Sequence, residues 1–149
     1  MLGYAYNPKY RTHLSGAPRE QRNEFHHGDC IGADEIAWIL ANYAGYHTLA
    51  HPCDIAEKRA FTNSDTIFST LPPLARNRTI VDVSDLVVAT PGEEEEVLRS
   101  GTWATIRYAK KQNRPLIIIF PSGKFQVFST TKFVDELVNE VFRMKNSVV

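Results

Sequence analysis

Two runs of apolar residues without polar alternation mark the second half of the chain. The first, 85–90, is closed by Pro91 and Gly92, and the second, 116–120, is bounded by a proline at each end. Strands of this kind are covered on both faces, as in parallel sheets. A loop and the helical pattern 103–111 lie between them. This stretch therefore predicts a strand, a loop, a helix and a second strand.

An earlier stretch predicts the same succession. Segment 25–34 reads as a strand followed by a glycine-containing loop that opens a helix. Gly45 stands where a glycine commonly ends a helix, and a third strand runs from about residue 46 to Pro52. The apolar residues of this helix share one face: Ile36, Ile39, Leu40 and Tyr43.

The segments around these units are less regular. Residues 2–6 predict a first strand, and the chain up to Phe25 is long enough for a parallel crossover, which needs about a dozen residues. Residues 53–73 predict a long surface loop with a short helical piece near 56–61. A loop of that length in a compact domain is usually functional. Helix 74–83 then leads into the strand that begins at residue 85.

The end of the chain predicts a further strand, 125–128, and a last amphipathic helix capped by Thr130 or Thr131. The apolar face of that helix consists of Phe133, Leu137, Val138, Val141 and Phe142. Alternating strands and helices predict a Rossmann-like three-layer α/β/α sandwich with a mostly parallel sheet and a small C-terminal strand addition. We expect a single domain over 1–149, in which 1–24 is atypical.

Composition narrows the class of function. The chain has 149 residues, and its 17 Lys+Arg balance its 17 Asp+Glu, so it has no global attraction for nucleic acid. No run is long enough to span a membrane, and the N-terminus lacks the apolar core of a signal peptide. We therefore expect a cytoplasmic protein with no membrane partner, and its two cysteines are expected to be reduced thiols.

The first glycine loop is a candidate ligand site. Gly28, Gly32 and Asp34 stand between a strand and a helix, where backbone amides at a helix N-terminus bind phosphate or ribose. A tight turn with Asp34 favouring the helix dipole is the alternative interpretation. Asp29 is a candidate ribose contact.

The second glycine loop follows the strand that ends at Pro91 and Gly92. Ser100, Gly101 and Thr102 have the chemistry of a helix start, in which a hydroxyl caps the first amides and glycine lets a ligand approach the backbone. An ordinary helix cap is the alternative. Loops at the carboxyl ends of strands are the usual ligand sites of doubly wound sheets.

Charged and aromatic side chains add further candidates. Arg76 and Arg78 lie two apart on a helix and point different ways, so at most one enters the site, and we choose Arg76. Arg99 is a comparable anion ligand or a partner of the acidic run. That run, Glu93 to Glu96, is a candidate for binding a metal or a ribose hydroxyl, or a solvated loop. We expect Trp103 either to stack on the base of a ligand or to pack in the core or in a dimer interface.

The cysteines and nearby histidines match no familiar zinc pattern, so we expect no metal and no cofactor. A nucleophilic Cys30 paired with a histidine is an open alternative to a small buried thiol. The residues concerned are Cys30, Cys53, His26, His27 and His51.

The chain resembles the SLOG superfamily, a Rossmann-like group that includes the DprA/SMF proteins and the "Lonely guy" phosphoribohydrolases. The resemblance lies in HGDCIGAD (27–34), Arg76-Asn77-Arg78, Ser84-Asp85 and RSGTWATIRYA (99–109), and covers roughly residues 25 to 123. It is greatest to a small bacterial and phage branch with a GDCxGAD loop and an RSGTWxTIRYA helix. The family implies a nucleotide-derived ligand and a homodimer, here through the apolar faces of the Arg76 and Trp103 helices.

In the phosphoribohydrolases of this superfamily, an arginine and a glutamate act on an N-glycosidic bond. The resemblance places Arg76 at the arginine position, but Thr105 stands at the glutamate position and cannot supply the carboxylate that a developing sugar cation needs. Glu95 or Glu96 would have to replace it, which gives Arg76, Glu95 and Glu96 as catalytic candidates.

Three functions follow from these observations. The first is a module that binds a nucleotide-derived small molecule, as a sensor or by sequestering it. The second is a nucleoside-phosphate N-glycosidase. The third, single-stranded DNA binding like that of DprA, is disfavoured by the neutral charge and the lack of a basic stripe with interleaved aromatics.

Overall fold

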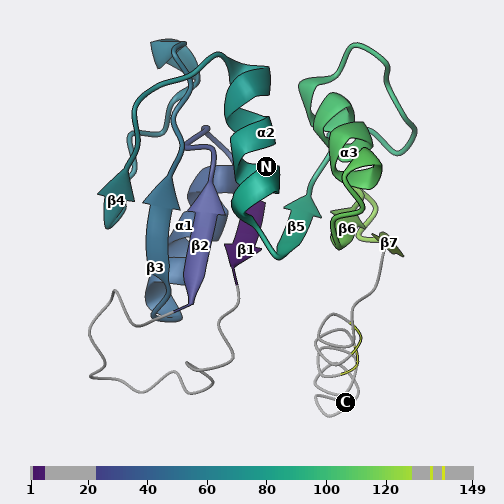
Figure 1. Cartoon of the computed structure of the whole chain (residues 1–149), viewed down its shortest axis with the longest axis horizontal. Coiled ribbons are helices and arrows are strands. Elements are labelled where there is room, and N and C mark those ends of the chain that lie inside the picture. The colour runs from purple at the N-terminus through teal and green to yellow at the C-terminus, as the bar shows by residue number, and fades with distance from the viewer. Residues whose placement is uncertain (1, 6–22, 129–134, 136–138, 140–149) are drawn as a thin grey trace.

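The computed structural model describes residues 2–5, 23–128, 135 and 139. Strands in this part of the chain form one seven-stranded sheet, and three α-helices pack on it (Figure 1). The strands are β1 (Leu2–Ala5), β2 (Glu24–His27), β3 (His47–Ala50), β4 (Thr66–Ile67), β5 (Leu86–Ala89), β6 (Leu116–Ile119) and β7 (Phe125–Phe128). The helices are α1 (Ala33–Tyr43), α2 (Pro73–Val83) and α3 (Gly101–Lys111), with a short 3-10 helix at Ala56–Lys58.

The strand order is β4-β3-β2-β1-β5-β6-β7. β2, β3 and β4 are parallel, as are β5 and β6. β1 lies between the two groups and is antiparallel to both β2 and β5, so these five strands all run in one direction. β7 adds an antiparallel edge to β6. The sheet is therefore mixed, with three parallel and three antiparallel pairs and five strands running in one direction, which confirms the α/β fold class and the strand addition after β6.

The helices divide between the two faces of the sheet. α1 packs on β2 and β3, whereas α2 packs on β1 and α3 packs on β5 and β6. In Figure 1, α1 lies behind the sheet and α2 and α3 lie in front of it. This division follows from the right-handedness of crossovers, because the step from β2 to β3 and the step from β5 to β6 go in opposite directions along the sheet.

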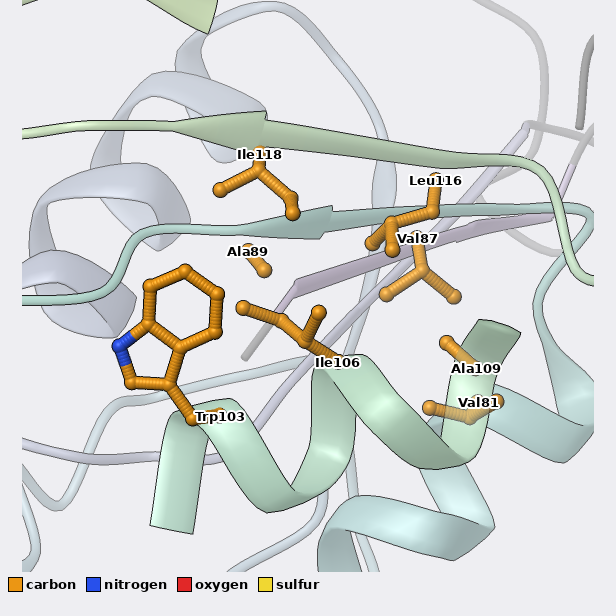
Figure 2. Packing of buried hydrophobic residues seen from close by; sticks show 8 residues of the cluster. All are labelled: Val81, Val87, Ala89, Trp103, Ile106, Ala109, Leu116 and Ile118. Carbon is orange, nitrogen blue, oxygen red and sulfur yellow. The ribbon is translucent and has the colours of Figure 1, made fainter. Parts of the chain in front are cut away.

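The apolar core lies on the side of α2 and α3 (Figure 2). α3 contributes its face at Trp103, Ile106 and Ala109, a spacing of three residues that follows one side of a helix. Each large side chain buried in this way contributes about 1.5–3 kcal/mol. The complete cluster is Val81, Val87, Ala89, Trp103, Ile106, Ala109, Leu116 and Ile118.

The structure corrects the prediction for the first strand. Its residues do form a strand, but β1 is antiparallel to both neighbours, so β1 and β2 are not joined by a parallel crossover. In addition, the predicted loop 53–73 contains β4, which pairs with β3 and was not predicted. The helical piece expected near 56–61 is the 3-10 helix Ala56–Lys58.

In two elements, the observed burial of side chains differs from the burial predicted from the apolar pattern of the sequence. The apolar face of α1 is on the surface: Ile36, Leu40 and Tyr43 are 60%, 64% and 93% exposed. α1 instead buries Ala41 and the polar Asp34. Similarly, Ile119 of β6 is 40% exposed, so the expectation that this strand is covered on both faces is wrong for the described residues.

Two predicted segments fall outside the described residues. They are residues 6–22, which belong to the atypical N-terminal segment, and most of the helix predicted after Thr130 or Thr131. In the described part of the chain, none of the helices is both long and apolar enough to span a bilayer.

Gly3 of β1 tests the packing between the central strand and α2. A methyl group there would meet the side chains of Ser84 and Ile80, and neither has room to move because both are 0% exposed. We expect Gly3→Ala to lower the free energy of unfolding by about 1–3 kcal/mol in urea titrations. Gly92→Ala is the matched control because its added methyl group meets nothing within 4 Å. Equal stability of the two variants would contradict this packing.

Candidate functional site

The parallel strands β2 to β6 all end at one edge of the sheet, and both glycine loops lie there. The loop 28–32 follows β2, and the loop 90–100 follows β5. β1 separates these strands: Leu2 pairs with His27 on one side and Val88 on the other. At about 4.8 Å per strand spacing, β2 and β5 are about 10 Å apart. The helices that follow lie on opposite faces, so this is a topological switch point, where doubly wound sheets bind ligands.

The loop 28–32 is held by the rest of the protein. The amide of Cys30 donates to Asp34 Oδ2 at 3.3 Å, and the amide of Ile31 donates to the carbonyl of Lys58 at 3.0 Å. Gly32 has φ 98°, a conformation that favours glycine. The backbone groups expected to hold a phosphate are therefore partly engaged by acceptors within the chain.

Asp29 binds the protein rather than solvent. It is 1% exposed, and its carboxylate accepts hydrogen bonds from the Thr62 amide and hydroxyl, both at 2.8 Å, and from Arg59 Nε at 2.9 Å. Burial alone would raise the pKa of Asp29, but the hydrogen bonds from Thr62 and Arg59 hold it below its ordinary value. The predicted ribose contact thus anchors the segment 53–73 to the first glycine loop.

Arg76 reaches from α2 to the same loop. Its Nη1 donates to the carbonyl of Gly28 and, at 3.0 Å, to the carbonyl of His51, and its Nη2 lies 3.4 Å from Cys30 Sγ. The side chain is only 4% exposed, and its Nε has no hydrogen-bond partner. Arg78, as expected, points elsewhere and stacks on Tyr108. Arg76 is therefore buried, but as a clamp on backbone carbonyls rather than as a surface salt bridge.

The start of α3 is more open. Ser100 caps the helix as predicted, since its Oγ accepts from the Trp103 amide at 3.4 Å. Gly101 is exposed, and a side chain added there would meet nothing within 4 Å. Thr102 is half-buried and Arg99 is exposed. Pro91 is buried and Gly92 is exposed where β5 ends.

The acidic run is tied to its surroundings by partners that were not predicted. Glu93 accepts from Trp103 Nε1 at 3.2 Å, Glu94 accepts from Ser122, and Glu96 pairs with Arg107 at 2.7 Å. Among the described contacts, Arg99 does not pair with these glutamates. Arg107 lies eleven residues beyond Glu96 in the sequence. The pairing of these two residues can therefore be recognised only when the position of α3 is known.

The catalytic candidates do not come together in the described contacts. Thr105 is 2% exposed and bonded to the Gly101 carbonyl and to Asn77, so it holds α2 against α3. Neither Glu95 nor Glu96 contacts Arg76 among the residues the structure describes.

His27 heads a buried chain of hydrogen bonds. Its Nδ1 accepts from the Asp29 amide at 3.1 Å, so its Nε2 carries the proton and donates to Ser64 Oγ at 2.8 Å. Ser64 lies 3.0 Å from Thr62, which donates to Asp29. Burial lowers the pKa of His27 to about 4. This histidine is therefore neutral and structural.

His26 points to the other face of β2 and pairs with His51. The His26 Nδ1 and His51 Nε2 atoms are 2.9 Å apart, and both rings border a cavity beneath α2 that includes Arg76 and Phe68. Burial lowers the pKa of His51 to about 4 and also lowers that of His26. No periodic pattern in the sequence indicates this cavity, because its walls come from separate elements.

The cysteines, histidines and acidic groups are the potential metal ligands of the described residues. Cys30 and Cys53 are free thiols. Among the described residues, no group of three or more His, Cys, Asp or Glu side chains is placed to hold a metal ion.

Comparison with protein-family models, with curated proteins and with solved structures finds no match to this chain.

The buried histidines predict an acid-sensitive fold. His27 and His51 have an ordinary pKa of 6.5 when unfolded and about 4 when folded, so the unfolded state binds more protons between these values. The free energy of unfolding should fall as the pH falls from 7 to 5, by about 2 kcal/mol per histidine. Asp29 does not contribute here, because its lowered pKa acts only below about pH 4.

Urea unfolding at pH 7.5 and pH 5 measures this dependence. His51→Gln should reduce the difference between the two pH values, because glutamine does not titrate. An unchanged difference in both His51→Gln and His27→Gln would contradict the assignment.

Asp29→Asn tests the anchor of the segment 53–73. Asparagine tolerates the φ of 57° at this position, but its amide would face the Arg59 donor and its charge is lost. We expect a loss of about 1.5–3 kcal/mol in the free energy of unfolding. Asp54→Asn, at an exposed position, is the control, and equal effects of the two changes would contradict the anchoring role.

Proposed function

We propose that this chain binds a nucleotide-derived small molecule at the carboxyl edge of its sheet. The observation that carries the proposal is the switch point between β2 and β5, which brings the ends of two strand-to-helix loops to the same edge. Ligands of open α/β sheets bind in the crevice at such a point. The resemblance of the two loops to SLOG sequences supports the same class of ligand.

The two loops contribute differently to this proposal. The start of α3 offers an exposed glycine, a capping serine and the positive end of a helix dipole, which together suit a phosphate. The loop 28–32 is already bonded to Arg76, Asp34 and Lys58, so it forms a rigid wall of the site. We therefore place the anionic end of the ligand at Ser100, Gly101 and Thr102.

Binding without turnover is favoured over N-glycosidase chemistry. The described contacts of Arg76 are to backbone carbonyls and to Cys30. Thr105 is buried in a helix contact, and the carboxylate of Glu96 is paired with Arg107. An N-glycosidase needs a free carboxylate beside the sugar, and none of these groups offers one. Glu95 is exposed and does not contact Arg76 among the described residues.

Homodimerisation and a cytoplasmic location remain part of the proposal. The ring of Trp103 packs in the core of its own chain, so α3 does not present it to a partner. The apolar face of α1 is the more exposed surface for a second copy, since Ile36, Ile39, Leu40 and Tyr43 are each more than half exposed.

Gly101 allows a matched test of the anion contact. Gly101→Glu and Gly101→Gln add side chains of the same size into open space, but only glutamate repels a phosphate. A carboxylate in the first helical turn does not destabilise a helix. The ligand panel consists of the mono-, di- and cyclic phosphates of adenosine, guanosine, cytidine and uridine. We expect at least one of these nucleotides to bind, as measured by native mass spectrometry and calorimetry. Gly101→Glu should lower the affinity for that nucleotide at least tenfold relative to Gly101→Gln.

The same samples report turnover, because released free base is measured by chromatography. Bound nucleotide that is returned unchanged supports a sensor or sequestering protein, whereas released base would make the chain a glycosidase. Failure of every nucleotide to bind, or equal binding by the two Gly101 variants, would overturn the proposed site.

A further inference from the structure

A cavity of about 350 Å³ lies between α2 and the strands β2 and β3. His26 and His51 form its polar wall, and Phe68, Leu71 and Val83 contribute apolar surface. Its size is within the range of small-molecule sites, which are mostly apolar and contain a few placed polar groups. It lies on the β2 and β3 side of α2, whereas α3 packs on β5 and β6.

The hydrogen bonds of His26 fix which atoms of the histidine pair carry protons. His26 Nε2 lies 3.3 Å from the Glu24 carboxylate, which can only accept, so His26 Nε2 carries the proton. In the neutral ring, His26 Nδ1 is then an acceptor, and His51 Nε2, at 2.9 Å, must donate to it. His51 Nδ1 consequently has a free lone pair and no hydrogen bond in the described structure. His51 thus offers the cavity a hydrogen-bond acceptor.

Arg76 borders the cavity, and its guanidinium is held by the protein itself. Its Nη atoms bond to Gly28, His51 and Cys30, but its Nε–H has no acceptor although the side chain is 96% buried. A buried donor without a partner costs about 1–3 kcal/mol, more when it is charged. Because this Nε atom is enclosed by the protein, a ligand in the cavity does not reach it.

Phe68 gives the cavity a flat wall. Its ring stacks on His51 with centroids 4.6 Å apart, and it is 44% exposed. Phe68 packs on the ring that offers the acceptor, so a planar ligand that reaches His51 also meets an aromatic surface. Stacked aromatic rings are favoured beyond their buried area.

From these observations we propose that the cavity binds a planar heteroaromatic ring that has an N–H group on its edge. The N–H of that edge donates to His51 Nδ1, and the ring stacks beside Phe68. Nucleobases with a lactam and pyridine carboxamides belong to this class. The site is separate from the anion contact at α3, and the proposal does not depend on it.

2-Pyridone and 1-methyl-2-pyridone are matched probes for this cavity. They have the same ring and carbonyl, but the methyl group removes the N–H donor. We expect saturable binding of 2-pyridone to the full chain by NMR titration, at least fivefold tighter than binding of the methylated probe. The ¹⁵N resonance of His51 Nδ1 should shift on binding of 2-pyridone.

Variants distinguish the loss of this binding site from a general effect on the fold. Phe68→Ala should lower the affinity for 2-pyridone at least fivefold. Phe61→Ala, which removes an exposed ring outside the cavity, should leave this affinity unchanged. Gly101→Glu should also leave it unchanged, so failure at α3 and failure here are distinguishable. Absence of saturable binding, equal binding of the two probes, or an unaffected Phe68→Ala variant would overturn the proposal.

Discussion

The carboxyl edge of the sheet depends on one buried cation, the guanidinium of Arg76. It joins α2 to the end of β2 through Gly28 and to the end of β3 through His51. A buried charge is strongly unfavourable unless it is hydrogen-bonded, so these carbonyls must remain in place once α2 is docked. Gly28 is required for the same reason, because a side chain there would collide with both Arg76 and Asp34. The cation thereby holds the first glycine loop in one conformation.

This constraint makes the two glycine loops unequal. The first is bonded to α2 and, through Asp29, to the segment that contains Arg59 and Thr62, so it is rigid. The second is fastened mainly by surface glutamates, and the helix start at Gly101 is exposed. A rigid wall beside an open helix start allows a ligand to approach one loop without displacing the other.

The sequence was sufficient for most elements because their signals are local. Apolar periodicity located α1, the helix-start residues Ser100, Gly101 and Thr102 located α3, and the apolar runs located β5 and β6. Strand direction is not local: nothing in residues 2–5 distinguishes a parallel from an antiparallel strand, and the pairing with β2 and β5 decides it. Likewise, apolar periodicity in α1 does not reveal which face meets the sheet, and that face proved to be the one with Asp34 and Ala41.

The candidate site was predictable in its loops but not in its contacts. Glycines and the Ser100 cap are visible in the sequence, whereas the partners of Asp29 lie about thirty residues away in a segment without periodicity. The cavity combines His26, His51 and Phe68 from three separate segments, so it emerges only from the pairing of β2, β3 and β4.

Buried residues divide the protein into two halves of different chemistry. Around β5, β6 and α3 they are nearly all apolar, and Val87, Leu116 and Ile118 are each 0% exposed. Around the ends of β2 and β3 they include three histidines, His26, His27 and His51, and Arg76, polar groups whose burial is unfavourable unless they are hydrogen-bonded. Departures from the simplest packing are concentrated at functional sites. His26, His51 and Arg76 all line the cavity beside α2, so the departure from apolar packing coincides with the place where we propose a ligand.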